Sequence, residues 1–247
     1  MPTDLLPIAE LKQLWQQAFR EPMDSIDLFF RTGFSPERCL YTQKEGRTVC
    51  ALYWFDCQWQ QKRLAYIYAL ATLESHRGQG LAGQLLARTH RHLARLGYHG
   101  VILKPTDGLF PFYEKQGYVT SGYIRRLNLE AGPVPVPVKE LSKEDYARLR
   151  RQYLSSDSVI QEGAALDYLH TYARFWEGPE CVLCTLRNEP EMLEFLGAPG
   201  CAPGVLCALN IQKATPITPG YHTPFLMYHS LTCTEEEGPV YLGLSLE

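Results

Sequence analysis

The sequence predicts an α/β (α+β) fold, in which helices flank a mixed, mostly antiparallel sheet and a second, smaller domain follows. Three observations predict it: three successive strand-like runs, a strand–glycine turn–helix–strand unit after them, and a proline-rich segment before a second half with a similar order of elements. With 45% hydrophobic and 21% charged residues, the chain has enough apolar surface to offset the entropy lost on folding.

Two helices are expected first. Residues 8–20 carry apolar side chains at helical spacing, and residues 25–30 suggest a second, short helix. Strand-like runs follow at 39–43, 48–57 and 64–73, rich in β-branched and aromatic residues, with a hairpin connection at 59–62. These runs predict an antiparallel meander.

A helix over 79–96 comes next and ends at Gly97. At 100° per residue one face of it is apolar (Ala82, Leu85, Leu86, Leu93, Leu96) and the opposite face basic (Arg88, Arg91, Arg95). The apolar strand 101–103 follows, so a right-handed crossover makes 64–73 and 101–103 parallel neighbours.

A turn at 105–108, a short helix over 109–116 and a strand over 118–129 complete the first half. Pro133, Pro135 and Pro137 then favour an extended spacer, which places a domain boundary near 132–138 and predicts domains 1–132 and 133–247.

The second half repeats the order of elements without a residue-level repeat. Helices are expected over 142–154, which begins with a capping box, and over 164–176. A glycine- and proline-rich turn at 197–204 leads into the apolar run 205–211. The strand-like runs are 181–186, 192–196, 225–231 and 240–246.

The distribution of charge limits the kinds of ligand that the protein is expected to bind. The net charge of −3 argues against a general nucleic-acid binder, while residues 75–106 hold five basic and no acidic side chains. That segment is either a site for an anionic ligand or a solvated helix face. No run is long and apolar enough for a membrane span, and the N-terminus lacks signal-peptide features, which predicts a cytoplasmic protein. A homo-oligomer is compatible with the sequence.

The eight cysteines do not establish a disulfide framework in a chain without a secretion signal. A zinc site built from Cys181, Cys184, Cys201 and Cys207 is disfavoured, because strand alternation would point the first two sulfurs to opposite faces. Buried thiols that act as small hydrophobic groups are the favoured interpretation, and no metal is expected.

The segment 72–83 has the chemistry of an anion cradle. Its glycines let the backbone approach a ligand, the N–H groups at the start of the helix are free to donate, and the helix dipole favours negative charge. Arg77 adds a permanent positive charge. Neither a Walker loop nor a dinucleotide fingerprint fits, since no Gly-Lys-Ser/Thr is present and the turn follows an antiparallel meander.

Here the sequence resembles the GNAT (GCN5-related N-acetyltransferase) superfamily. Its signature Arg/Gln-x-x-Gly-x-Gly/Ala is matched over 77–82, and a second element, a helical tyrosine followed by glycine and an aromatic residue, is matched over 112–118. The resemblance covers residues 5–130. One departure is that the family's first strand is missing or vestigial before Ile8.

The resemblance implies a GNAT fold with splayed central strands and acetyl-CoA lying in the splay. Pantetheine would pair with the backbone of Leu70, Ala71 and Thr72. Tyr113 would act as general acid on the departing thiolate, since an ordinary tyrosine holds its proton at neutral pH. The pyrophosphate, beside Arg77, would bind the N–H groups of Gly78, Gln79, Gly80, Leu81, Ala82 and Gly83.

The residues leave the identity of the general base open. Members of the family that use a glutamate in the middle of the fourth strand would need one near Leu64 in this sequence, and none is present there. Glu74 and His76 are candidates at the end of that strand, and each is alternatively a turn residue or cap. Alternation places Tyr66, Tyr68, Leu70 and Thr72 on one face, where the tyrosines either line the acceptor pocket or pack under a helix.

The layout is also similar to the enhanced-intracellular-survival type of acetyltransferase, in which a degenerate second GNAT-like domain follows the active one. The turn at 197–204 contains two prolines, which remove donors that a pyrophosphate would use, so no CoA site is expected there. The third domain of that type has no counterpart, which leaves Glu247 a speculative base.

Together these observations predict an N-acetyltransferase that moves the acetyl group of acetyl-CoA to a primary amine of a small molecule or peptide. The alternative is a non-catalytic acyl-CoA sensor or partner-binding module, and a third reading is a zinc-stabilised interaction protein. The residues do not name the acceptor.

Overall fold

Apolar side chains at helical spacing build the first elements, as predicted. The computed structural model of the protein describes residues 6–232 and 237–246. Its first helices are α1 (Ile8–Phe19) and α2 (Met23–Thr32), followed by a short 3-10 turn, η1 (Pro36–Arg38). The predictions for Cys233 and Glu247 fall outside the described residues.

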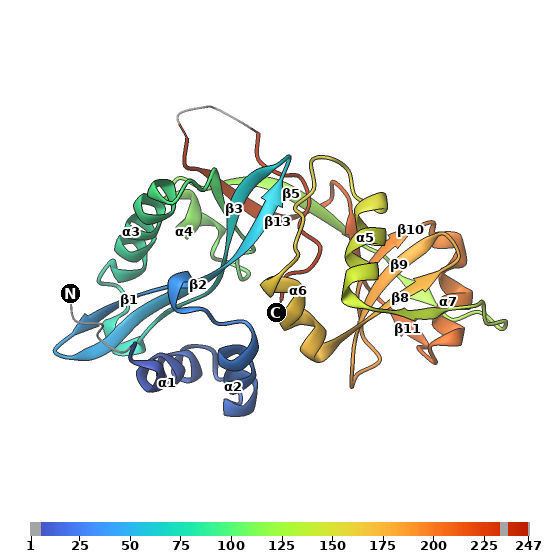
Figure 1. Ribbon diagram of the computed structural model, residues 1–247, viewed down its shortest axis with the longest axis horizontal. Helices are drawn as coiled ribbons and strands as arrows, with labels where there is room; N and C mark the ends of the chain where they lie inside the picture. Colours follow the sequence, from blue (N-terminus) through green and yellow to red (C-terminus); the bar gives the residue numbers. More distant parts are fainter. Residues whose placement is uncertain (1–5, 233–236, 247) are drawn as a thin grey trace. The chain divides into compact units, whose positions relative to one another are not determined.

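The described residues form two compact units, and most of their helices and strands are labelled in Figure 1. The first takes 6–57, 62–119 and 228–232, and the second takes 58–61, 120–227 and 237–246. This division differs from a boundary at residue 132, because the last strand of the chain returns part of its length to the first unit. The domains 1–132 and 133–247 remain a prediction.

The sheet of the first unit has the order β1-β2-β3-β4, with the end of β13 next to β4. Strands β1 and β2 are antiparallel, as expected for a meander. On one face, Trp15 of α1 stacks near Tyr53 and Tyr68, with ring centroids 5.2 and 5.5 Å away. On the other, His92 of α3 lies 6.1 Å from Trp54. The strands are β1 (Cys39–Lys44), β2 (Arg47–Trp59), β3 (Lys62–Thr72), β4 (Gly100–Leu103) and β13 (Thr223–Ser230).

The parallel pairing of β3 and β4 confirms the predicted crossover. The pairing runs from Leu64–Gly100 to Tyr66–Ile102 and then stops, although β3 continues to Thr72. The two strands therefore separate beyond Tyr66, which is the splay that the resemblance implied.

The predicted alternation along β3 is wrong at its second half. Ala69 has φ +54°, a left-handed conformation that interrupts the pleat of the strand. Before it, Tyr68 faces Trp15 of α1; after it, the hydroxyl of Thr72 lies 3.3 Å from the sulfur of Cys50. Cys50 shares the face of Trp54, which meets α3, so Tyr68 and Thr72 point to opposite faces of the sheet.

Helix α3 (Leu81–Arg95) follows a 3-10 turn, η2 (Glu74–His76), and ends before Gly97, which has φ +78°. On its apolar face Leu85, Leu86 and Leu93 are buried as predicted, Ala82 is half-buried, and Leu96 is 50% exposed because it lies past the last helical turn. Helix α4 (Phe110–Glu114) is next, and β5 (Val119–Arg126) and β6 (Leu129–Glu130) replace the single predicted strand.

The second unit has the strand order β5-β12-β10-β9-β8-β7, with the start of β13 next to β5. Strand β6 pairs separately with β11 (Lys213–Ala214). The other strands are β7 (Lys139–Leu141), β8 (Ala173–Gly178), β9 (Cys181–Leu186), β10 (Met192–Gly197) and β12 (Ile217–Pro219). The helices are α5 (Lys143–Tyr153), α6 (Ala164–Tyr172), the 3-10 turn η3 (Pro199–Cys201) and α7 (Ala202–Ala208).

Two predictions for this unit are wrong. The helix expected to reach residue 176 ends at Tyr172, and the segment after it forms β8, which pairs along its whole length with β9. The run 240–246 makes one isolated bridge, Tyr241 with Ser158, instead of a strand. The proline-rich segment 131–138 is neither helix nor strand, and within it Gly132 and Val136 donate backbone hydrogen bonds to Pro203 and Gly204.

A buried ion pair lies at the centre of the second unit. Arg150 donates two hydrogen bonds to Glu194, at 2.7 and 2.8 Å, and both side chains are almost wholly buried. The hydroxyls of Tyr146 and Tyr241 donate to the same carboxylate at 2.8 and 2.9 Å. Each carboxylate oxygen of Glu194 thus accepts two hydrogen bonds. A buried charge is tolerated when it is paired and hydrogen-bonded in this way.

Among the described residues, no helix has the length and apolar character needed to cross a bilayer.

Candidate functional site

The turn between β3 and α3 has the backbone geometry of an anion cradle. Gly78 and Gly80 have φ +75° and +72°, a left-handed region that favours glycine, and both are exposed. Gly80 caps α3 without any side-chain hydrogen bond to the first turn. The N–H groups at the start of α3 therefore have no side-chain acceptor from the cap and lie at the positive end of the helix dipole.

Positive charge surrounds this turn. The Nε of Arg77 donates to the carbonyl oxygen of Thr72 at 3.3 Å, so the guanidinium folds back over the end of β3. Lys44, from β1, donates to the side-chain oxygen of Gln79 at 2.7 Å. Two cations thus flank the glycines, Arg77 from the turn itself and Lys44 from β1.

The end of β3 lies beyond its pairing with β4. Leu70 and Thr72 are half-buried and Ala71 is buried. The pairing of β3 with β4 ends at Tyr66, and Ala69, just before these residues, has a left-handed backbone conformation. The role of residues 70–72 in holding a pantetheine arm stays a prediction.

Tyr113 lies on α4 and is 8% exposed. Its ring packs edge-on against Phe112 and Tyr118, with centroids 5.0 and 5.6 Å away. The α4 end is fixed locally, since the N–H groups of Gln116 and Tyr118 both donate to the carbonyl of Tyr113.

The glycine turn and the tyrosine helix come together. A Cβ at Gly83 would lie only 2.9 Å from the Oε1 of Gln116, so the first turn of α3 packs directly on the second residue after α4. About two helical turns further on, His90 of α3 lies 2.8 Å from the hydroxyl of Tyr118. The two sequence elements that carry the family resemblance thus form one contiguous region.

Sequence reasoning missed His90 and His229 in this region. The ring of His229, from β13, stacks on His90 at 4.1 Å and lies 5.2 Å from Tyr118. His90 lies within the predicted crossover helix, where its spacing from the apolar face offered a weak signal. No local pattern points to His229, which is 112 residues from its partner Gly117.

The two base candidates lie in the turn η2. Glu74 is exposed, and its backbone carbonyl accepts from Arg77 at 3.1 Å. The Nδ1 of His76 lies 2.9 Å from the hydroxyl of Ser75. Both are at the carboxyl end of β3, as expected, and their roles stay predictions.

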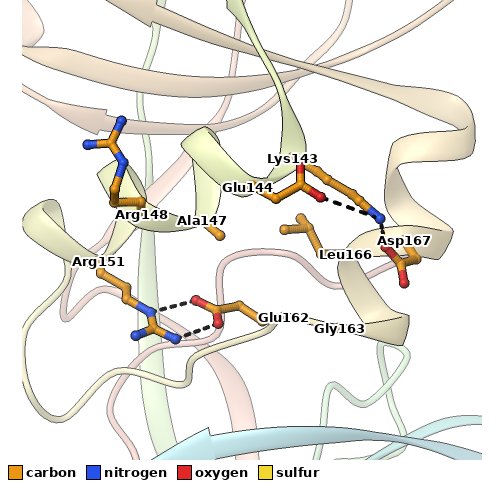
Figure 2. A pocket seen from close by; sticks show the side chains of 9 residues that line it. All are labelled: Lys143, Glu144, Ala147, Arg148, Arg151, Glu162, Gly163, Leu166 and Asp167. Carbon is orange, nitrogen blue, oxygen red and sulfur yellow. Dashed lines mark hydrogen bonds and ion pairs between the residues drawn. The ribbon is translucent and has the colours of Figure 1, made fainter.

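A separate cavity lies in the second unit, between α5 and α6 (Figure 2). It has a volume of about 530 Å³. Arg151 makes a two-point contact with Glu162 across it, and Lys143 pairs with Asp167. The acidic side chains Glu162 and Asp167 are thus paired with basic side chains that line the same cavity. None of the predicted site residues lines it.

The cysteine thiols behave as core groups. Burial raises the pKa of Cys39 to about 12 and that of Cys184 well above its usual value. The cysteines of the described part of the chain are free thiols, and over that part no three His, Cys, Asp or Glu side chains gather closely enough to hold a metal ion.

Comparison with protein families identifies the first part of the chain. Residues 7–120 match the family model described as "Acetyltransferase (GNAT) domain", a range that includes both motifs. No curated protein matches the sequence.

Solved structures extend the similarity of fold across both units. A GCN5-related N-acetyltransferase from Anabaena variabilis aligns over 91% of this chain and 70% of its own, with 14% identity and a TM-score of 0.72. Eis1 from Mycobacterium abscessus aligns over 89% of this chain and 70% of its own, with 10% identity and a TM-score of 0.62.

A tandem GNAT protein from the clavulanic acid biosynthesis pathway aligns over 94% of this chain and 97% of its own, with 11% identity and a TM-score of 0.55. At these identities the structures establish the fold, and the family model carries the enzyme class. Residues 7–120 match the GNAT acetyltransferase domain, which supports an acyltransferase of the acetyl-CoA-dependent class, and the solved structures share the fold over both units.

Proposed function

We propose that the protein transfers the acetyl group of acetyl-CoA to a primary amine of a small molecule or peptide, by direct attack of the amine on the thioester. The observation that carries this proposal is the direct packing of the α3 turn, near Gly83, on the end of the tyrosine helix at Gln116. That contact brings the glycine turn next to the end of the helix that carries Tyr113, which supports assigning both to one site.

The cradle residues fit a diphosphate. Gly78 to Gly83 would offer backbone N–H groups at the α3 N-terminus, where negative charge is stabilised, and Arg77 would add a charge-assisted contact. Leu70 to Thr72 would hold the pantetheine arm along the splayed end of β3. Bound there, acetyl-CoA supplies an activated acyl group with a thiolate leaving group.

Tyr113 serves as the general acid in this proposal. The amine nitrogen forms a bond to the carbonyl carbon, the carbon–sulfur bond breaks with its electron pair on sulfur, and the Tyr113 hydroxyl gives its proton to that sulfur. Glu74, exposed at the end of β3, is the proposed base that takes the proton of the attacking amine. Positioning of two substrates supplies much of the remaining rate enhancement.

The test is acetyl transfer to a panel of polyamines, aminoglycosides and peptides, followed by mass spectrometry of the products. We expect Tyr113→Phe to lower kcat about 100-fold or more, because a positioned general acid contributes about that factor. Acetyl-CoA binding, measured by calorimetry, should stay unchanged.

Tyr221→Phe is the matched control, because Tyr221 is 91% exposed and distant in sequence from both motifs. Binding of acetyl-CoA without transfer to any acceptor would favour the sensor instead of the enzyme, and no binding at all would refute both.

A further inference from the structure

Two histidines from distant parts of the chain meet at the turn that follows the tyrosine helix. His90 comes from the middle of α3 and His229 from β13. Their rings are nearly parallel, with centroids 4.1 Å apart and an interplanar angle of 19°. All the residues of this cluster belong to the first compact unit.

His229 is hydrogen-bonded to the backbone of that turn. Its Nδ1 lies 2.9 Å from the carbonyl oxygen of Gly117, and because a carbonyl only accepts, the Nδ1 carries the proton and donates it. Gly117 has φ +82°, and a Cβ there would lie 3.2 Å from the imidazole. Glycine at this position therefore serves both the turn and the close approach of the ring.

His90 holds the next residue. Its Nε2 lies 2.8 Å from the hydroxyl of Tyr118, whose ring is fully buried and packs edge-on against Tyr113 at 5.6 Å. Burial, followed by the nearby charges of His229 and Arg91, lowers the pKa of His90 to about 3. His90 is therefore neutral at physiological pH and forms a hydrogen bond without introducing charge.

The strand that carries His229 is itself fixed. Tyr228 is buried against Gly100 of β4, where any side chain would overlap its ring. On the other side, the N–H of Leu231 donates to the carbonyl of His99 at 2.9 Å. His99 and Gly100, at the start of β4, thus hold the chain on both sides of His229, so its imidazole can act as a rigid support.

We propose that His90 and His229 are positioning residues, which clamp the Gly117–Tyr118 turn and thereby set the position of Tyr113. The inference rests on the proposed role of Tyr113 as general acid. It means that the C-terminal strand supplies part of the support for an acid located more than a hundred residues earlier in the chain.

The test uses the full-length protein with His229→Ala and His229→Asn. Asparagine retains an amide N–H that can donate to the Gly117 carbonyl, whereas alanine does not. We expect His229→Ala to lower kcat about 10-fold with the KM for acetyl-CoA within about twofold of wild type, since small displacements of a catalytic group have effects of this size. His229→Asn should recover most of the loss.

A second readout does not depend on activity. In protein labelled with 3-fluorotyrosine, the Tyr113 resonance is assigned by its loss in Tyr113→Phe. That resonance should shift or broaden in His229→Ala and return toward its wild-type position in His229→Asn. His222→Ala is the matched control, since His222 is exposed.

An unchanged Tyr113 resonance in His229→Ala would overturn the inference, and so would equal effects of alanine and asparagine. Failure of the wild-type protein to transfer acetyl groups would instead refute the proposed function, because the fluorine signal still reports whether His229 holds Tyr113.

Discussion

Two glycine-rich turns lead into helices in this chain, and they differ in what surrounds their backbone. At the first, Gly78 and Gly80 are exposed, and a Cβ on Gly78 would meet nothing within 4 Å. At the second, residues 197–200 are exposed as well, but the proline-rich segment is bound to the first turn of α7, with Gly132 donating to the Pro203 carbonyl at 2.9 Å and Val136 to that of Gly204 at 3.2 Å.

The same order of a glycine-rich turn and a helix therefore occurs in two different surroundings. At the start of α7, the chain itself binds the carbonyls of Pro203 and Gly204. At the first turn the polar groups face solvent, where a ligand can take them. We therefore expect acetyl-CoA to bind at the α3 turn and not at the α7 turn.

The largest expected effect comes from filling the second turn. A Cβ at Gly204 would lie 2.5 Å from a methyl carbon of Val136 and 3.2 Å from the carbonyl oxygen of Val134. Gly204→Ala should lower the free energy of unfolding by about 1–3 kcal/mol through overpacking, as measured by denaturant titration. The affinity of the folded protein for acetyl-CoA should be unchanged.

Gly200→Ala is the matched control, because a Cβ at Gly200 would meet nothing within 4 Å. A loss of acetyl-CoA affinity in Gly204→Ala would contradict the contrast between the two turns.

The next effect is at the first turn. Gly80→Ala puts a side chain on a residue with φ +72°, at a cost of about 1–2 kcal/mol that the turn can relieve by rotating its N–H groups away from the ligand. We expect acetyl-CoA to bind about 10-fold more weakly by calorimetry.

Gly46→Ala carries the same kind of strain, with φ +75°, in the hairpin between β1 and β2. It should lower stability and leave acetyl-CoA affinity intact. Equal affinities in Gly80→Ala and wild type would show that this turn is not the cradle.

The smallest effect is expected at Arg77. Its guanidinium is exposed, so solvent and salt screen its contribution. Arg77→Gln should weaken acetyl-CoA binding about fivefold at low salt, which corresponds to about 1 kcal/mol. The difference should shrink as ionic strength rises, and a difference independent of salt would argue against a charge contact with the ligand.

Much of the first unit was predictable because its signals are local. Helical spacing located α1 and α3, and glycines located the ends of α3. The second unit was harder. The predicted end of α6 was wrong because β8, which follows it, is stabilised by pairing with β9. No local sequence pattern indicates that pairing. The first residues of α7 include Pro203, which is tolerated in a first helical turn but also typical of loops.

The sequence by itself determined the glycine cradle, the tyrosine helix and the parallel crossover, because glycine conformation, helix dipoles and hydrophobic periodicity act over a few residues. Only the tertiary structure decided three other features. These are the left-handed Ala69 that turns the end of β3 to the other face, the hydrogen bonds of the proline-rich segment to the first turn of α7, and the contact of His229 with Gly117. Each depends on which distant strands and loops pack together, and that choice is made by the whole fold.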